Sequence, residues 1–174
     1  PFSDPAVMAG NGTIGLEILE DLPDVDAVII AYAGGGLSCG IGSAIRALKP
    51  KVKLYAAEVD TGAPFAASMA MSKPVVVEHI PTFVDGISGT MVFEEMWPLA
   101  SSLMDGALVS TLKNVAEASK LMAERNRTIA EGAGAASLAA ALSHQVSDGK
   151  IVCIISGGNI DSKKLVNILS GGIP

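Results

Sequence analysis

Short runs of β-branched and other apolar residues alternate along the chain with longer segments whose apolar residues recur at helical spacing. The pattern predicts strands at residues 25–32, 52–57, 107–109 and 150–155. It predicts helices at residues 38–48, 63–71, 92–104, 111–126, 132–144 and 161–169. The first strand, VDAVIIAY, is almost continuously apolar, which is typical of a strand buried on both sheet faces. We therefore expect an α/β fold with an open, mainly parallel sheet and helices on both faces.

One predicted helix contains a proline. Pro98 lies inside residues 92–104, where it must either be tolerated or break the helix. At the start of the chain, Pro1–Pro5 has a loop-like sequence without an initiator Met. We expect this start to be an engineered or proteolytic boundary within a longer protein. The length of 174 residues suits a single domain.

Composition narrows the possible partners. Hydrophobic residues make up 49% of the chain, yet the longest apolar runs, such as Ala27–Ala33, are far shorter than the roughly 20 residues of a membrane span. The net charge of −6, without a basic run, argues against nucleic acid or an anionic membrane as the principal partner. Cys39 and Cys153 lack metal-type spacing, and we interpret them as reduced thiols of a cytoplasmic protein.

A glycine-rich loop, Ala33–Gly40 (AGGGLSCG), lies between the first strand and the helix that follows it. Three consecutive glycines expose successive backbone N–H groups and can adopt positive φ, so they can form an anion-binding nest. The helix that follows adds the positive end of its dipole. The loop therefore predicts a phosphate site. The alternative is a tight turn that needs glycine for close packing of helix on sheet.

A second glycine motif, Gly10–Gly15, matches G-x-G-x-x-G but lacks the context of a dinucleotide site. The residues before it are not typical of a strand, and Leu22–Asp24 is a turn rather than a strand-end acid. We interpret this motif as the start of a helix, with Thr13 close to its N-cap.

The third loop, Ser156–Asn159 (SGGN), follows the last predicted strand. A hydroxyl at the carboxyl end of a core strand points toward the crevice where open parallel sheets bind ligands. The alternative is a capped helix start, because Ser156, Asn159 and Asp161 are all good capping residues.

Taken in order, these motifs resemble the threonine dehydratase and serine racemase family of fold-type II enzymes, which depend on pyridoxal phosphate (PLP). The resemblance covers nearly the whole chain, in the segments PFSDPAVMAGNGTIGLEIL, AGGGLSCGI, LYAAE, VDGIS, EGAGAASLAA and SGGN. It implies that residues 1–174 are the C-terminal part of the PLP-binding catalytic domain.

The resemblance also implies residue roles. The family's tetraglycine phosphate loop corresponds to Ala33, Gly34, Gly35, Gly36 and Leu37, with alanine in place of the first glycine. The partner of the pyridine nitrogen falls on Ser156, and the other cofactor-binding positions are Gly86, Glu131 and Asn159. Because a neutral hydroxyl does not hold that nitrogen protonated, the ring is a milder electron sink, which suits elimination of a β-hydroxyl.

Relatives with a divalent cation use a glutamate that corresponds to Glu58. Oxygen ligands of this kind suit Mg²⁺ or Ca²⁺. A second acidic ligand would fall near Pro64, which cannot serve, so the alternative is that Glu58 is simply an acid at a strand end.

The family's Schiff-base lysine lies in a Ser-Phe-Lys-x-Arg stretch, and this sequence contains no such stretch. His79 and His144 have no acid or cysteine arranged with them as a triad. We therefore expect no catalytic residue in this chain, an inactive isolated fragment, and a missing N-terminal part that carries the lysine and the substrate clamp.

For the complete protein, the resemblance implies a lyase of amino-acid metabolism that converts a hydroxy amino acid to a 2-oxo acid and ammonia. A homo-oligomer is expected. Two alternatives stay open: an amino-acid racemase of the same fold, and a non-catalytic α/β domain that binds a nucleotide or another anion.

Overall fold

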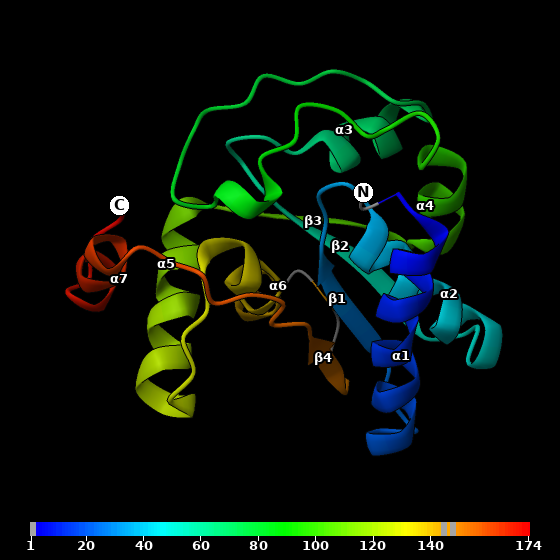
Figure 1. The fold of residues 1–174 in the computed structure, drawn as a ribbon, viewed down its shortest axis with the longest axis horizontal. Helices are drawn as coiled ribbons and strands as arrows, with labels where there is room; N and C mark the ends of the chain where they lie inside the picture. The colour runs from blue at the N-terminus through cyan, green and yellow to red at the C-terminus, as the bar shows by residue number, and fades with distance from the viewer. Residues whose placement is uncertain (1–2, 144–145, 147–148) are drawn as a thin grey trace.

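A single parallel sheet forms the centre of the computed structural model, which describes residues 3–143, 146 and 149–174 (Figure 1). Its strands are β1 (Ala27–Ala31), β2 (Lys53–Val59), β3 (Gly106–Ser110) and β4 (Ile151–Cys153), in the order β3-β2-β1-β4. All neighbouring pairs are parallel, and Ile29 of β1 pairs with Tyr55 of β2 and Cys153 of β4. The predicted α/β fold with a mainly parallel sheet is confirmed.

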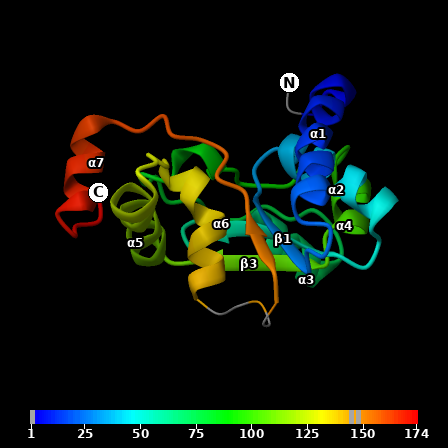
Figure 2. The same ribbon diagram turned by 90° about the horizontal axis from the view of Figure 1, so that it is seen from below.

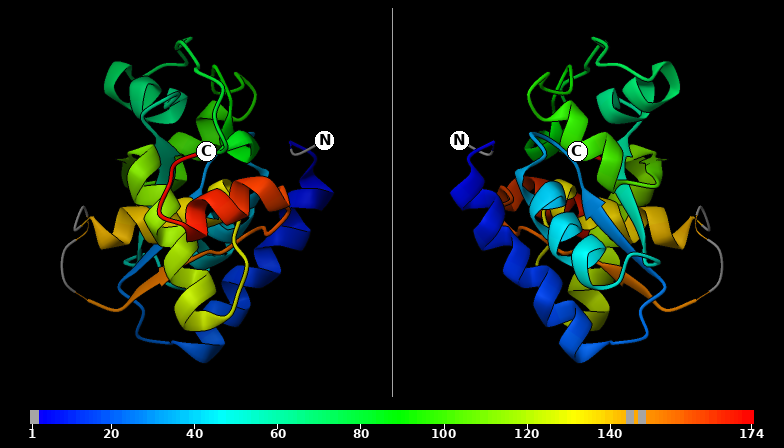
Figure 3. Two further views of the ribbon diagram at one scale, coloured as in Figure 1. Left: turned by 90° about the vertical axis from the view of Figure 1, so that its left-hand side faces the viewer. Right: turned by 90° about the vertical axis from the view of Figure 1, so that its right-hand side faces the viewer.

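Helices cover both faces of this sheet. They are α1 (Pro5–Asp21), α2 (Gly36–Leu48), α3 (Pro64–Met71), α4 (Trp97–Leu103), α5 (Leu112–Leu121), α6 (Gly132–Leu142) and α7 (Ser162–Leu169). Figure 2 shows α1, α2 and α4 on one side of the sheet, with α5 and α7 on the other. The helix α7 packs against the outside of α5 (Figure 3). Within the described residues, every helix is too short or insufficiently apolar to cross a membrane.

The strand β1 separates two hydrophobic cores. Every residue from Ala27 to Ala31 is buried, and alternate side chains face opposite sides of the sheet. Val28 and Ile30 pack with α2 and α4, whereas Ile29 and Ala31 pack with α5 and α6. This burial on both faces explains why the strand is a continuous apolar run in the sequence.

The first helix begins earlier than the sequence suggested. Asp4 is its N-cap, with Oδ1 accepting a 2.8 Å hydrogen bond from the Ala6 N–H, and Pro5 occupies the first turn. The expected helix start near Thr13 is therefore wrong, because α1 runs straight through the G-x-G-x-x-G motif. Two of its glycines serve packing against α2: a Cβ on Gly12 would lie 3.3 Å from the Gly40 carbonyl oxygen, and one on Gly15 would lie 2.9 Å from the Ile41 carbonyl oxygen.

Other boundaries also shift. The helix expected at residues 92–104 begins only at Trp97, which places Pro98 in the first turn, where its missing N–H costs nothing. The strand expected to reach Ile155 ends at Cys153. After α5, residues Met122–Asn126 form a π-helical turn. The expected end of α6 at His144 lies outside the described residues, as does the start of the chain, Pro1 and Phe2.

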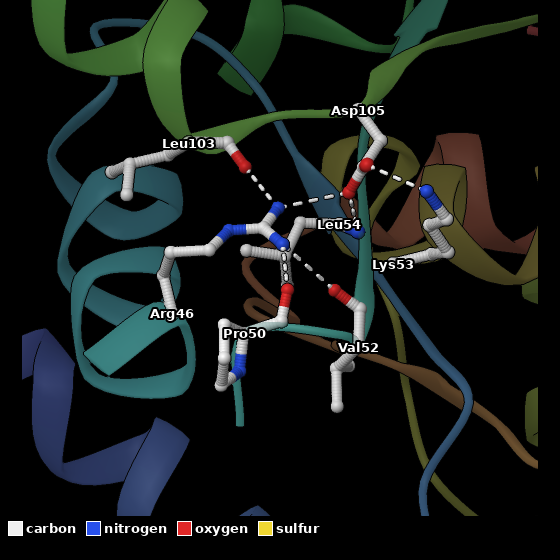
Figure 4. A network of polar contacts seen from close by, with 7 residues as sticks. All are labelled: Arg46, Pro50, Val52, Lys53, Leu54, Leu103 and Asp105. Atoms are coloured by element: carbon white, nitrogen blue, oxygen red, sulfur yellow. Dashed lines mark hydrogen bonds and ion pairs between the residues drawn. The ribbon is translucent and has the colours of Figure 1, made fainter. Parts of the chain in front are cut away.

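An arginine fixes the amino ends of two strands, far from their carboxyl-end loops (Figure 4). Arg46, near the end of α2, forms a 2.8 Å ion pair with Asp105, which precedes β3. Its guanidinium also donates to the backbone carbonyls of Pro50, Val52 and Leu103. Partial burial opposes ionisation of Asp105, but hydrogen bonds from Arg46, from the Leu54 N–H and from Lys53 hold its pKa below the usual value.

Both cysteines are free thiols, as predicted. Burial raises the pKa of Cys39 and of Cys153 to about 11, so both are protonated at neutral pH.

Candidate cofactor site

The loops that follow β1 and β4 open into one cavity of about 200 Å³. These two strands are neighbours in the parallel sheet, so their carboxyl ends lie side by side. The cavity is lined by residues 33–38 of the glycine loop and by Ser156, together with Gly86, Glu131 and their neighbours. The structure therefore brings together most of the predicted site residues.

The glycine loop leads directly into α2. Gly35 has φ +90°, in the left-handed region that favours glycine, and acts as the N-cap of the helix. The cap makes no side-chain hydrogen bond, so the first N–H groups of α2 are left for a ligand. Ala33 is not among the described non-glycine residues with positive φ, which are Ser72 and Arg127. An alanine is therefore compatible with the first position of the loop.

A buried serine anchors the loop to the strand before it. Ser38 is fully buried, and its Oγ donates a 2.9 Å hydrogen bond to the carbonyl of Ala31, the last residue of β1. The start of α2 is thereby tied to the end of the strand, with the glycines between them.

The opposite wall of the cavity comes from α6 and from a short 3-10 helix, Asp85–Ile87. Glu131 is the N-cap of α6, and its N–H donates a 3.0 Å hydrogen bond to the Gly157 carbonyl. A Cβ on Gly86 would lie 3.6 Å from Glu131 Oε1 and only 2.8 Å from the Ala133 Cβ. Glu131 and Gly86 are thus close neighbours in the lining of the cavity.

Asn159, the remaining predicted cofactor residue, lies apart from this cavity. It is exposed three residues beyond Ser156 and does not contribute to the lining. A role of Asn159 in cofactor binding stays a prediction.

Glu58, the predicted metal ligand, faces α3 rather than the cavity. Its carboxylate is buried and accepts hydrogen bonds of 2.8 Å from the Phe65 N–H and 2.7 Å from the Ala66 N–H. Burial raises the pKa of Glu58 to about 7, although these two bonds act in the opposite direction. Glu58 therefore caps the first turn of α3.

The surroundings of Glu58 do not fit a cation site in this conformation. Among the residues that the structure describes, no group of three or more His, Cys, Asp or Glu side chains is arranged to hold a metal ion. The binding of Mg²⁺ or Ca²⁺ at Glu58 stays a prediction of the resemblance.

Sequence reasoning missed the side chains that hold the loops in place. The sequence did not predict a role for the Ser38 hydroxyl or for that of Ser137, which donates a 2.8 Å hydrogen bond to the Ile154 carbonyl. A serine inside the alanine-rich helix GAGAASLAAAL was the available signal. His79 does not line the cavity, and His144 lies outside the described residues.

Comparison with known proteins places this geometry in a family. Residues 1–157 match the family described as "Pyridoxal-phosphate dependent enzyme". The chain is 39% identical to L-threonine ammonia-lyase of Geobacter sulfurreducens over 175 residues, covering 99% of this chain and 44% of that protein. It is 33% identical to serine racemase of Oryza sativa subsp. indica over 168 residues, covering 92% of this chain and 49% of that protein.

The fold agrees with these relatives. The processed form of threonine deaminase isoform 2 from Solanum lycopersicum superposes with a TM-score of 0.90 at 31% identity, over 98% of this chain and 48% of that one. The chain thus belongs to the family of pyridoxal-phosphate dependent enzymes. Within it, the predicted membership of the fold-type II threonine dehydratase and serine racemase group is confirmed. The chain spans about half the length of the relatives that it matches.

Proposed function

We propose that this chain is part of an enzyme that uses PLP to eliminate the β-hydroxyl of a hydroxy amino acid such as threonine or serine. The products are a 2-oxo acid and ammonia. One observation carries the proposal: the uncapped start of α2 and Ser156 line the same cavity. The L-threonine ammonia-lyase of Geobacter sulfurreducens, which is 39% identical, supports threonine as the first substrate to test.

The cavity has the chemistry that PLP requires. Backbone N–H groups of residues 34–37 at the N-terminus of α2 would hold the phosphate, because the helix dipole and the free donors both favour an anion. The Ser156 hydroxyl would meet the pyridine nitrogen on the adjacent wall. Gly86 and Glu131 line the same cavity and would contact the bound cofactor.

Bound PLP supplies an electron sink for the pair of electrons released when a bond at the substrate Cα breaks. Ser156 sets the strength of that sink. A neutral hydroxyl makes a hydrogen bond with the pyridine nitrogen without holding it protonated, as a carboxylate would. A moderate sink suits expulsion of the β-hydroxyl, since the leaving group relieves the charge at Cα.

We propose that the nucleophilic lysine and the residues that bind the substrate carboxylate lie in the N-terminal part of the complete protein. No lysine lines the described cavity. The isolated chain is therefore expected to lack activity while retaining part of the cofactor site. The cytoplasmic location and assembly into a homo-oligomer stay predictions.

The direct test is a binding titration of the complete protein with PLP, in parallel with NAD and ATP. Saturable PLP binding that weakens in a Ser156→Ala variant is expected. Binding of NAD or ATP instead of PLP would favour the nucleotide-binding alternative and contradict the proposal.

Racemisation is the second candidate function, because the chain is also 33% identical to a serine racemase. A product assay separates the two reactions. Incubation with L-serine or L-threonine yields a 2-oxo acid if elimination dominates, and a D-amino acid if racemisation dominates.

A further inference from the structure

The turn that carries Ser156 is attached to α6 rather than to the sheet. The pairing of β4 with β1 ends at Cys153, and the last backbone hydrogen bond to β1 runs from the Ile154 N–H to the Ile29 carbonyl, at 3.0 Å. Beyond that point, the turn lies against the start of α6 and the residues just before it, including Glu131 and Ile129. The position of the Ser156 hydroxyl therefore depends on how this helix holds the turn.

Two hydrogen bonds join α6 to the segment on either side of Ser156. Two residues before it, the carbonyl of Ile154 accepts a 2.8 Å bond from Ser137 Oγ, and both residues are buried. One residue after it, the Gly157 carbonyl accepts a 3.0 Å bond from the Glu131 N–H. Ser156 is thus held between two fixed carbonyls.

The two backbones are also in direct contact. A Cβ placed on Gly134 would lie 2.9 Å from the Gly157 nitrogen and even closer to its carbonyl oxygen. A Cβ on Gly157 would in turn overlap the Glu131 carboxylate. Because Gly134 and Gly157 lack side chains, the backbones of α6 and the turn are in direct contact. This contact restricts the geometry of the hydrogen bond from Ser137.

Ser137 is an unusual residue for its surroundings. Serine inside a helix commonly bonds to the carbonyl one turn earlier, as Ser101 Oγ in α4 does to the Trp97 carbonyl at 2.7 Å. Ser137 instead reaches across to a residue 17 positions away. It is fully buried among alanines, where a hydroxyl is unfavourable unless its hydrogen bond is satisfied.

We propose that Ser137 is a positioning residue for the cofactor: by fixing the Ile154 carbonyl, it sets the Ser156 hydroxyl at the pyridine nitrogen. This proposal rests on the proposed function, because it assigns Ser156 that contact. The same helix carries Glu131 to the cavity rim, so α6 aligns both side chains relative to the ring.

The test compares Ser137→Ala with a matched control, Ser119→Ala, in the complete protein. Ser119 is an equally buried helical serine on α5, and its hydroxyl has no hydrogen-bond partner among the described residues. Calorimetry measures the dissociation constants of PLP and of an analogue that keeps the phosphate but has carbon in place of the ring nitrogen. Ser137→Ala should weaken PLP roughly fivefold, the loss expected for one misaligned hydrogen bond, and the analogue less than twofold. Ser119→Ala should change neither.

A double-mutant cycle shows whether Ser137 acts through Ser156. With Ser156→Ala already present, adding Ser137→Ala should cause no further loss of PLP affinity. An equal loss for both ligands, or a full additional loss in the double variant, would overturn the proposal and leave Ser137 a purely structural residue.

If Ser137→Ala does not fold, Ser137→Cys is measured in its place. A thiol is similar in shape to the hydroxyl but is a weaker hydrogen-bond donor. It should give a loss of PLP affinity smaller than that of Ser156→Ala, again without a comparable effect on the analogue. If Ser156→Ala itself leaves the ratio of the two affinities unchanged, the role of Ser156 fails and this proposal with it.

Discussion

Ser38 Oγ donates a 2.9 Å hydrogen bond to the carbonyl of Ala31, which joins the second residue after the glycine run to the last residue of β1. The two ends of the loop are therefore tied to each other, with the three glycines between them. The proposed anion site is therefore held by the strand and the helix together rather than by the loop alone.

Replacing Ser38 by alanine should weaken PLP binding. The variant leaves the buried Ala31 carbonyl without its partner, so unfolding free energy should fall by about 1–3 kcal/mol. The control is Ser68→Ala: Ser68 is equally buried and its Oγ accepts a 3.2 Å bond from the Val75 N–H, away from the cavity. Urea unfolding and PLP titration of both variants should show that only Ser38→Ala loses affinity. Equal affinities in the two variants would argue against a role of Ser38 in shaping the loop.

Gly35 should be sensitive to substitution and Ala33 should not. Gly35 has φ +90°, so Gly35→Ala should cost about 1–2 kcal/mol of stability and weaken PLP binding. Ala33→Gly restores the family's glycine at a position that does not need it, and should change PLP affinity little. A strong gain in affinity from Ala33→Gly would show that the alanine impairs the phosphate site.

Glu58 should make stability fall as the pH rises through the neutral range. Burial raises its pKa from 4.5 to about 7, so the folded state binds the proton more tightly than the unfolded state does. Stability is therefore highest below pH 4.5 with respect to this group, declines between pH 4.5 and about 7, and levels off above that. The total change in unfolding free energy from this group is about 3 kcal/mol.

Denaturant unfolding at several pH values checks this prediction. The difference in stability between the native protein and Glu58→Gln should shift in favour of the variant as the pH rises from 5 to 7. Glu20→Gln, at an exposed position on α1, controls for the loss of one negative charge. A constant difference across this range would contradict the raised pKa.

Arg46→Ala should destabilise the fold without changing PLP affinity. The variant removes the ion pair with Asp105 and hydrogen bonds to three backbone carbonyls, for a loss of about 2–4 kcal/mol. The control, Lys113→Ala, breaks an exposed 3.8 Å pair with Glu117 and should cost no more than about 0.5 kcal/mol. Similar losses in the two variants would show that the network of Figure 4 adds little.

The sequence predicted those parts of the fold and site that depend on local chemistry. The glycine loop at Ala33–Gly36 directly follows a buried strand and directly precedes a helix. All three parts can therefore be recognised within one short stretch of sequence. Ser156 was likewise placed by its position after an apolar strand. Both loops reach the same cavity because β1 and β4 are adjacent in the sheet.

What the sequence did not reveal depends on contacts between distant segments. The helix α1 tolerates Gly12 and Gly15 because they allow close packing against α2, which outweighs their low helix propensity. The acceptor for Ser137 lies 17 residues away, and the partners of Glu58 belong to the next helix. No periodicity in the chain identifies such partners.

A crystal structure of the complete protein with PLP tests the central claim most directly. We predict that the phosphate lies within hydrogen-bond distance of the backbone N–H groups of residues 34–37, and that the ring nitrogen faces Ser156 Oγ. A phosphate bound elsewhere, or a ring nitrogen that faces away from Ser156, would contradict the account.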